Sequence, residues 1–204
     1  MISIVDYGLG NLRAFENIYK QMGIPVRLAH NAEDIMASSK LILPGVGAFD
    51  WALIRLKDSG MLDTLNYAVL EKKVPVLGVC VGMQIMANSS DEGSMPGLSW
   101  IDGEVKHFKE CILDHSLPMP HMGWNTVEIS SDCELFKGLS DPKYYFLHSY
   151  YLSMKSDSDI IGISTYGRKF TSAIKSGNIY ATQFHPEKSH HWGHQLLKNF
   201  AVYC

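Results

Sequence analysis

The chain has 204 residues, of which 46% are hydrophobic and 19% charged, a balance that allows a sizeable buried core and argues against disorder. Its 18 basic and 21 acidic residues give a net charge of −3, which is too small and too mixed to favour nucleic acid or an anionic membrane as a partner. The first apolar run, Ile2 to Val5, is too short for a signal peptide or a membrane span.

Length and cysteine usage set two further expectations. A chain of this length with no linker, repeat or low-complexity stretch predicts a single domain over residues 1–204. Cys80, Cys111, Cys133 and Cys204 lack CxxC spacing and the density of a disulfide framework. We therefore expect no metal, no cofactor and a reducing, cytoplasmic location.

The first half of the sequence alternates short apolar strands with helical patterns. Strands are expected at residues 2–6, 26–29, 41–43 and 75–79. Asn11 can cap a helix that ends at Gly23, and Asn31 can cap a shorter one. A longer helical stretch starts at Phe49 and resumes after Gly60. Strands joined by helical crossovers predict a mostly parallel sheet.

The second half has strands with short connections, expected at residues 105–108, 126–129, 144–152, 160–165 and 170–184. A hairpin turn is expected at Ser176-Gly177-Asn178. A final helix carries Trp192, Leu196 and Phe200 on one face. The predicted fold class is α/β, with three layers, a mostly parallel central sheet and an antiparallel extension.

Cys80 stands in the sequence Gly78-Val79-Cys80-Val81-Gly82, between an expected strand and an expected helix. Glycines on both sides allow the tight turn of a nucleophile elbow, which exposes the side chain at the carboxyl edge of a sheet. The following helix N-terminus favours a thiolate and aims backbone N–H groups at an oxyanion. The pattern predicts a nucleophilic cysteine; the alternative is a small buried residue in a glycine-rich turn.

A nucleophile needs a base, and the base needs a group that orients it. His185-Pro186-Glu187 follows an expected strand, and Pro186 fixes the backbone so that Glu187 can turn back towards His185. Alone, this tripeptide equally fits a polar turn at a strand end. The glycine-rich segment 43–49 can supply further N–H groups or can be an ordinary loop, and it lacks the lysine and hydroxyl residue of a phosphate loop.

Together these segments resemble class I glutamine amidotransferases, in which a PGVG loop, a GVCVGMQ elbow and a QFHPEKS segment occur in this order. Within that family, the chain is similar to the glutaminase subunits of imidazole glycerol phosphate synthases. The matching segments extend from the first strand to the last helix, at residues 7–11, 43–49, 78–84, 120–125, 146–151 and 183–189.

The resemblance implies that Cys80 attacks the side-chain amide of glutamine, forms a thioester and releases ammonia, with His185 as the base and Glu187 orienting it. It implies that backbone N–H groups of Val81 and of the loop at Val46 and Gly47 hold the oxyanion. The substrate-binding residues that it implies are Gln84, Glu92, His148, Ser149 and Tyr150. For Glu92, a solvated carboxylate at a helix end is the alternative.

The resemblance also implies a heterodimer with a (β/α)₈ cyclase subunit, which receives the ammonia through an enclosed channel. In the family, that cyclase uses ammonia to form imidazole glycerol phosphate in histidine biosynthesis. Asn11, Trp124 and Lys188 match family positions near the interface. Trp124 would equally suit a core position, and Lys188 a solvated one.

Two segments, residues 85–90 and 189–194, depart from the family pattern, and both are expected on helices that follow catalytic motifs. The second contains His190, His191 and His194, which fit a helix start with exposed rings better than a metal site, since no carboxylate or thiolate joins them. These departures resemble a paralogous branch that supplies ammonia to a sugar amidotransferase in surface-polysaccharide synthesis.

Two further alternatives remain open. A catalytically silent regulatory subunit is disfavoured because the three triad positions and Gln84 are present. A thiol hydrolase acting alone would not account for the PHMGWN and HPEKS segments. The ammonia acceptor cannot be recognised here, because it binds the other protein.

Overall fold

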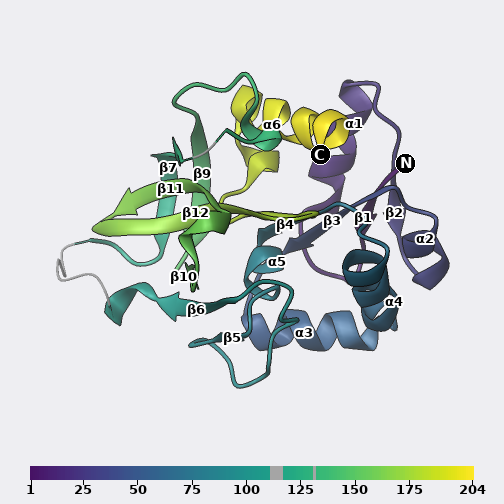
Figure 1. Ribbon diagram of the computed structural model, residues 1–204, viewed down its shortest axis with the longest axis horizontal. Helices are drawn as coiled ribbons and strands as arrows, with labels where there is room; N and C mark the ends of the chain where they lie inside the picture. Colours follow the sequence, from purple (N-terminus) through teal and green to yellow (C-terminus); the bar gives the residue numbers. More distant parts are fainter. Residues whose placement is uncertain (111–116, 131) are drawn as a thin grey trace.

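The computed structural model describes residues 1–110, 117–130 and 132–204 (Figure 1). As predicted, strands alternate with helices in the first half. The strands are β1 (Ile2–Val5), β2 (Val26–Ala29), β3 (Lys40–Gly45) and β4 (Val76–Cys80). The helices are α1 (Leu12–Gln21), α2 (Ala32–Met36), α3 (Phe49–Asp58), α4 (Leu62–Asn66), the π-helix η1 (Tyr67–Glu71) and α5 (Val81–Gln84).

The second half is rich in strands, and it ends in a long helix. Its strands are β5 (Ser89–Ser90), β6 (Gly103–His107), β7 (His121–Thr126), β8 (Glu128–Ile129), β9 (Lys143–His148), β10 (Tyr150–Met154), β11 (Ile160–Tyr166), β12 (Arg168–Ser176) and β13 (Ile179–Thr182). Short 3₁₀ helices are η2 (Phe108–Glu110), η3 (Glu134–Phe136), η4 (Asp157–Asp159) and η5 (Pro186–Lys188), and α6 spans His190–Tyr203.

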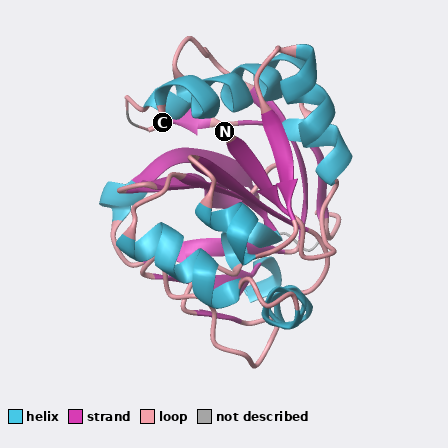
Figure 2. Ribbon diagram, turned by 90° about the vertical axis from the view of Figure 1, so that its right-hand side faces the viewer, coloured by secondary structure: helices cyan, strands magenta, loops and turns pink. Residues whose placement is uncertain are grey.

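Through the described residues runs an 11-stranded sheet whose central part is parallel. Strands β2, β1, β3, β4 and β13 lie side by side in this order and run parallel, and β12 and β10 continue the sheet antiparallel. Strands β7 and β9 form a separate antiparallel pair. Helices α1 and α6 cover one face of the central strands, and α3, α4 and α5 lie on the other (Figures 1 and 2). The predicted three-layer α/β fold with an antiparallel extension is confirmed.

The apolar runs of the parallel strands explain why they form the middle layer. All residues of β1 and β4 are buried, as expected for strands with helices over both faces. Helix α1 turns Phe15, Ile18 and Tyr19 inward, and the Tyr19 hydroxyl donates a 3.0 Å hydrogen bond to the carbonyl of Leu197 in α6. This contact ties the first helix to the last one.

Two predicted strands are wrong in their bounds. The expected strand at 144–152 is interrupted at Ser149, which leaves β9 in the small sheet and β10 in the large one. The expected strand at 126–129 divides between the end of β7 and the short β8. Strand β7 contains Gly123 and several polar residues, so local propensity did not indicate it; pairing with β9 along its whole length holds it.

The helix expected over residues 85–90 is also wrong, because α5 ends at Gln84. The carbonyls of Ile85 and Met86 accept hydrogen bonds from the N–H groups of Leu98 and Trp100, so this backbone pairs with a distant segment. Asn11 occupies the N-cap position of α1, but no cap hydrogen bond from its side chain is found among the described residues. The Asn31 side chain does cap α2 as predicted.

Candidate active site

Cys80 lies at the last position of β4, in a strained backbone conformation. Its φ of 56° and ψ of −113° place an L-residue in a region that costs about 1–3 kcal/mol. A Cβ on Gly82 would collide with the carbonyl oxygen of Leu43, and one on Gly78 would lie 2.7 Å from Cε of Met86. The backbone contact excludes a side chain at Gly82, and the space at Gly78 is tight, which is the geometry predicted for a nucleophile elbow.

Strand pairing brings the other predicted segments to this cysteine. Strand β3 pairs with β4 in a register that sets Gly45 opposite Cys80, so the PGVG loop lies beside the elbow. On the other side, β13 pairs with β4 up to Thr182 opposite Val79, so the segment that follows β13 runs past the cysteine. Because all three strands are parallel, their carboxyl ends meet at one edge of the sheet.

His185 and Glu187 form a buried ion pair at this edge. Nδ1 of His185 lies 2.8 Å from Oε1 of Glu187, and each side chain is 3% exposed. Nδ1–H therefore donates to the carboxylate, and Nε2 is left for Cys80. Glu187 Oε2 is buried without a hydrogen-bond partner in the described structure.

Burial and the two neighbouring side chains act on the pKa of His185 in opposite directions. Burial by itself lowers the pKa, but the hydrogen bonds and charges of Cys80 and Glu187 outweigh burial and raise the pKa of His185 to about 10. The imidazole is therefore protonated at neutral pH beside the cysteine. It can act as a general acid towards a leaving group.

The loop after β3 is held at both ends and open in the middle. The Tyr7 hydroxyl donates a 2.6 Å hydrogen bond to the carbonyl of Pro44, and the N–H of Phe49 donates a 2.9 Å bond to Oε2 of Glu92. Between these anchors Gly47 has a φ of 93°, which glycine adopts without strain. Val46 and Gly47, between the two anchors, line the cavity.

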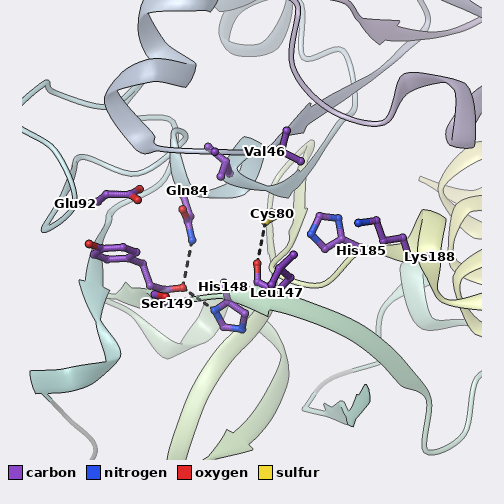
Figure 3. A pocket seen from close by; sticks show the side chains of 12 residues that line it. Val46, Cys80, Gln84, Glu92, Leu147, His148, Ser149, His185 and Lys188 are labelled. Atoms are coloured by element: carbon purple, nitrogen blue, oxygen red, sulfur yellow. Dashed lines mark hydrogen bonds between the residues drawn. The ribbon is translucent and has the colours of Figure 1, made fainter. Parts of the chain in front are cut away.

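Eleven of the fourteen predicted site residues and Leu147 line one cavity of about 200 Å³. Glu92 and Lys188 stand at opposite ends of a row formed by Gln84, Cys80 and His185 (Figure 3). The volume is below the ~300–1,000 Å³ of clefts for drug-sized ligands, so the cavity suits an amino acid better than a nucleotide. Its lining residues are Val46, Gly47, Cys80, Val81, Gln84, Glu92, Leu147, His148, Ser149, Tyr150, His185 and Lys188.

The predicted substrate-binding residues are linked inside the protein. Gln84 is 2% exposed, and its Nε2 donates to the carbonyl of Tyr150 at 3.2 Å and to Oε1 of Gln183 at 3.0 Å. The ring Nδ1 of His148 donates to the same Tyr150 carbonyl at 2.7 Å. Glu92 lies in a turn rather than at a helix end and accepts from Phe49.

Asn11 and Trp124 do not line the cavity. Trp124 is 46% exposed, so a core position is excluded, and its ring stacks on His190 at 5.3 Å between centroids. Asn11 is exposed at the start of α1, and Lys188 reaches from the cavity over the ring of Tyr145. Next to Trp124, the outer face of the β7–β9 pair also presents Met122 and Leu147, which are 65% and 38% exposed.

No group of three potential ligands that could hold a metal ion occurs in the described part of the chain. His190 and His191 begin α6 with exposed rings. Cys80, Cys133 and Cys204 are free thiols, and Cys111 falls outside the described residues.

Three buried residues near the site were not singled out from the sequence. Gln183 lies 3.8 Å from Cys80 through its amide nitrogen, Tyr7 holds the loop, and His121 bonds His148 at 3.0 Å. Each stands in a segment that carried the resemblance, which was the available signal. Their contacts join segments far apart in the chain, so no local pattern could have assigned them a role.

Sequence comparison places these observations in a family. The model of the family described as "Glutamine amidotransferase class-I" matches residues 3–204. The chain is 50% identical over 202 residues to the imidazole glycerol phosphate synthase subunit HisH of Bdellovibrio bacteriovorus, covering 98% of this chain and 99% of that one. The subunit of the same name from Leptospira borgpetersenii is 48% identical with the same coverage. Subunit HisH 2 of Methanococcus maripaludis is 42% identical over 201 residues, covering 98% of each chain.

Solved structures share the fold at low sequence identity. A crystal structure of a glutamine amidotransferase superposes with a TM-score of 0.75 at 17% identity, covering 98% of both chains. A glutamine amidotransferase from Thermotoga maritima superposes with a TM-score of 0.61 at 17% identity, covering 91% of this chain and 75% of that one. In the described parts of the chain, no helix combines the length and apolar character that crossing a membrane requires. The resemblance found in the motifs is confirmed: this chain belongs to the class I glutamine amidotransferase family.

Proposed function

We propose that this chain hydrolyses glutamine to glutamate and ammonia through a thioester on Cys80, as the glutaminase subunit of an imidazole glycerol phosphate synthase. The observation that carries the proposal is the convergence of Cys80, the buried His185–Glu187 pair and the PGVG loop on one amino-acid-sized cavity. The relatives that match over almost the whole chain have the name of that subunit. The proposal treats residues 1–204 as a single domain.

The geometry supports a two-stage reaction. Sγ of Cys80 attacks the side-chain amide carbon of glutamine, and its proton resides on His185. N–H groups of Val81 and of the loop at Val46 or Gly47 stabilise the oxyanion. His185 then gives its proton to the departing nitrogen, and ammonia leaves. Water, deprotonated by His185, hydrolyses the thioester and restores the thiol, while Glu187 stabilises the imidazolium at each stage.

Substrate binding follows from the layout of the cavity. Glu92 lies at the end of the row opposite Lys188, so its carboxylate is the partner for the α-ammonium group of glutamine (Figure 3). The backbone of residues 148–150 lines the same wall and can bind the α-amino acid end. Gln84 uses its N–H groups internally, which leaves its carbonyl oxygen to accept from substrate.

A partner enzyme completes the proposal. Ammonia remains a nucleophile only while unprotonated, so an enclosed path to a (β/α)₈ cyclase subunit in a cytoplasmic heterodimer serves the chemistry. The exposed face with Met122, Trp124 and Leu147 is continuous with the cavity, because Leu147 lines it. Asn11, Trp124 and Lys188 are the residues that we propose at the interface.

One mixing experiment tests function and acceptor together. The chain, a histidine-pathway cyclase from the same source, glutamine and the phosphoribosyl intermediate are expected to yield imidazole glycerol phosphate. No product there, with stimulation by a sugar amidotransferase instead, would assign the chain to the polysaccharide branch. No glutamine hydrolysis with either partner would leave the silent regulatory subunit.

The nucleophile has its own test. The Cys80→Ala variant is expected to lose glutamine hydrolysis while still supporting synthesis from added ammonium salt with the partner present. Retained hydrolysis above background would show that Cys80 is not the nucleophile.

A further inference from the structure

Gln183 is fully buried directly after β13, and the reaction proposed above gives it no role. Its Nε2 lies 3.8 Å from Sγ of Cys80, within hydrogen-bonding distance for sulfur. We propose that Gln183 is a positioning residue that donates an amide N–H hydrogen bond to the thiolate of Cys80 and so holds the sulfur in its reactive place. This inference rests on the glutaminase function proposed above.

The orientation of the Gln183 amide is set by its neighbours. The backbone carbonyl of Tyr150 can only accept, so the Gln84 group 3.2 Å from it must be the amino group. That amino group also lies 3.0 Å from Gln183, which must therefore present its oxygen to Gln84. The amino group of Gln183 is then directed at Cys80. A flipped Gln183 amide would set two donors against each other in the interior.

The sulfur needs such a donor once its proton has left. Cys80 is 4% exposed, so water contributes little to stabilising a thiolate there. The carbonyl of Leu147, 4.0 Å from Sγ, can accept from the thiol but cannot stabilise the thiolate. An amide donates whatever the pH, and it therefore stabilises the thiolate before the attack on glutamine and again when the thioester is hydrolysed.

Titratable groups also face the sulfur, and the test must separate them from Gln183. They come from each element packed around Cys80 and are Tyr7, Glu92, His148, His185, Glu187 and Lys188. The uncharged change Gln183→Met adds and removes no titratable group. In that variant, a shift in the pH dependence of Cys80 alkylation therefore reports on the loss of the amide.

The experiment measures the rate at which iodoacetamide alkylates Cys80 as a function of pH, by mass spectrometry of the peptide that carries Cys80. The Gln183→Met variant removes the donor at similar length, and Gln183→Glu replaces it with an acceptor. Ser172→Ala is the matched control, because Ser172 is buried beside Gln183 and its hydroxyl has no partner among the described residues. Thermal unfolding verifies that each variant is folded.

We expect the half-maximal pH of alkylation to rise by about one unit in Gln183→Met, which is about a tenfold loss of rate at pH values below the half-maximal pH. The half-maximal pH is expected to rise further in Gln183→Glu and to stay unchanged in Ser172→Ala. In the Gln183 variants, kcat for glutamine is expected to fall, with KM little changed. If neither Gln183 variant folds, Gln84→Met, which removes the donor that orients Gln183, is expected to show a smaller shift in the same direction.

An unshifted alkylation profile in a folded variant would overturn the proposal, even if activity were lost. Alkylation needs no glutamine, so this outcome is separate from a failure of the proposed function. That failure would appear as glutamine hydrolysis surviving in Cys80→Ala.

Discussion

Nδ1 of His121 lies 3.0 Å from Nε2 of His148, and both residues are buried, His148 in the wall of the cavity and His121 outside its lining. Asn125 donates to Nε2 of His121, and Nδ1 of His148 donates to the carbonyl of Tyr150, so the proton between the rings belongs to His121. Burial lowers the pKa of His121 to about 4 and, together with the charge of His121, that of His148 to about 3. Two neutral histidines thus connect β7 to the wall of the cavity.

This pair predicts a loss of stability in acid. Because both pKa values are lowered on folding, the stabilisation is complete above the unfolded value near 6.5 and is lost as pH falls through 4. His121→Phe, which keeps the stacking on Phe146 and Tyr166, is expected to reduce the drop in unfolding free energy between pH 7 and pH 4 by on the order of 2 kcal/mol. Urea unfolding at both pH values measures this drop in unfolding free energy. The same drop in His121→Phe as in the unchanged protein would contradict the role of the buried neutral His121.

The pairing of His185 with Glu187 predicts the alkaline limit of the reaction. Glu187→Gln removes a charge that raises the pKa of His185, so His185 loses its proton at lower pH and can no longer protonate the leaving nitrogen. We expect the alkaline limb of the kcat profile to move to lower pH and kcat at neutral pH to fall by about 10²-fold. Asp159→Asn, in the 3₁₀ helix η4 and outside the cavity lining, serves as the charge control. An alkaline limb that stays in place would contradict the role of the carboxylate.

The two glycines of the elbow predict unequal costs. Gly82→Ala drives a Cβ into the carbonyl oxygen of Leu43, whereas Gly78→Ala meets the flexible end of Met86. We expect Gly82→Ala to destabilise the fold by about 3 kcal/mol and Gly78→Ala by about 1 kcal/mol. Urea unfolding of both variants gives the comparison, and equal losses would show that the backbone contact is not decisive.

The exposed Trp124 predicts a contribution to partner binding. Aromatic residues at the centre of an interface often carry much of the binding energy, so Trp124→Ala is expected to weaken binding to the cyclase by at least about tenfold. Tyr67→Ala is the control, because Tyr67 is 45% exposed on η1. Calorimetric titration with the partner measures both, and similar affinities for the two variants would move the interface elsewhere.

The sequence by itself determined the features that depend on neighbouring residues. The apolar runs of β1 and β4, the cap of Asn31 on α2 and the glycines around Cys80 act within a few residues, so pattern alone indicated them. The order of the matching segments then indicated the family. The helical crossovers of the first half predicted the parallel strands at whose carboxyl edge the elbow stands.

Only the tertiary structure decided the features that depend on distant partners. Residues after Gln84 leave the helix because Leu98 and Trp100 take their carbonyls, and β7 exists because β9 pairs with it. Gln183 faces Cys80, 103 positions away in sequence, because β13 aligns with β4 across the sheet. A hydrogen bond depends on distance and direction between two groups, and only the folded chain brings these groups within reach of each other.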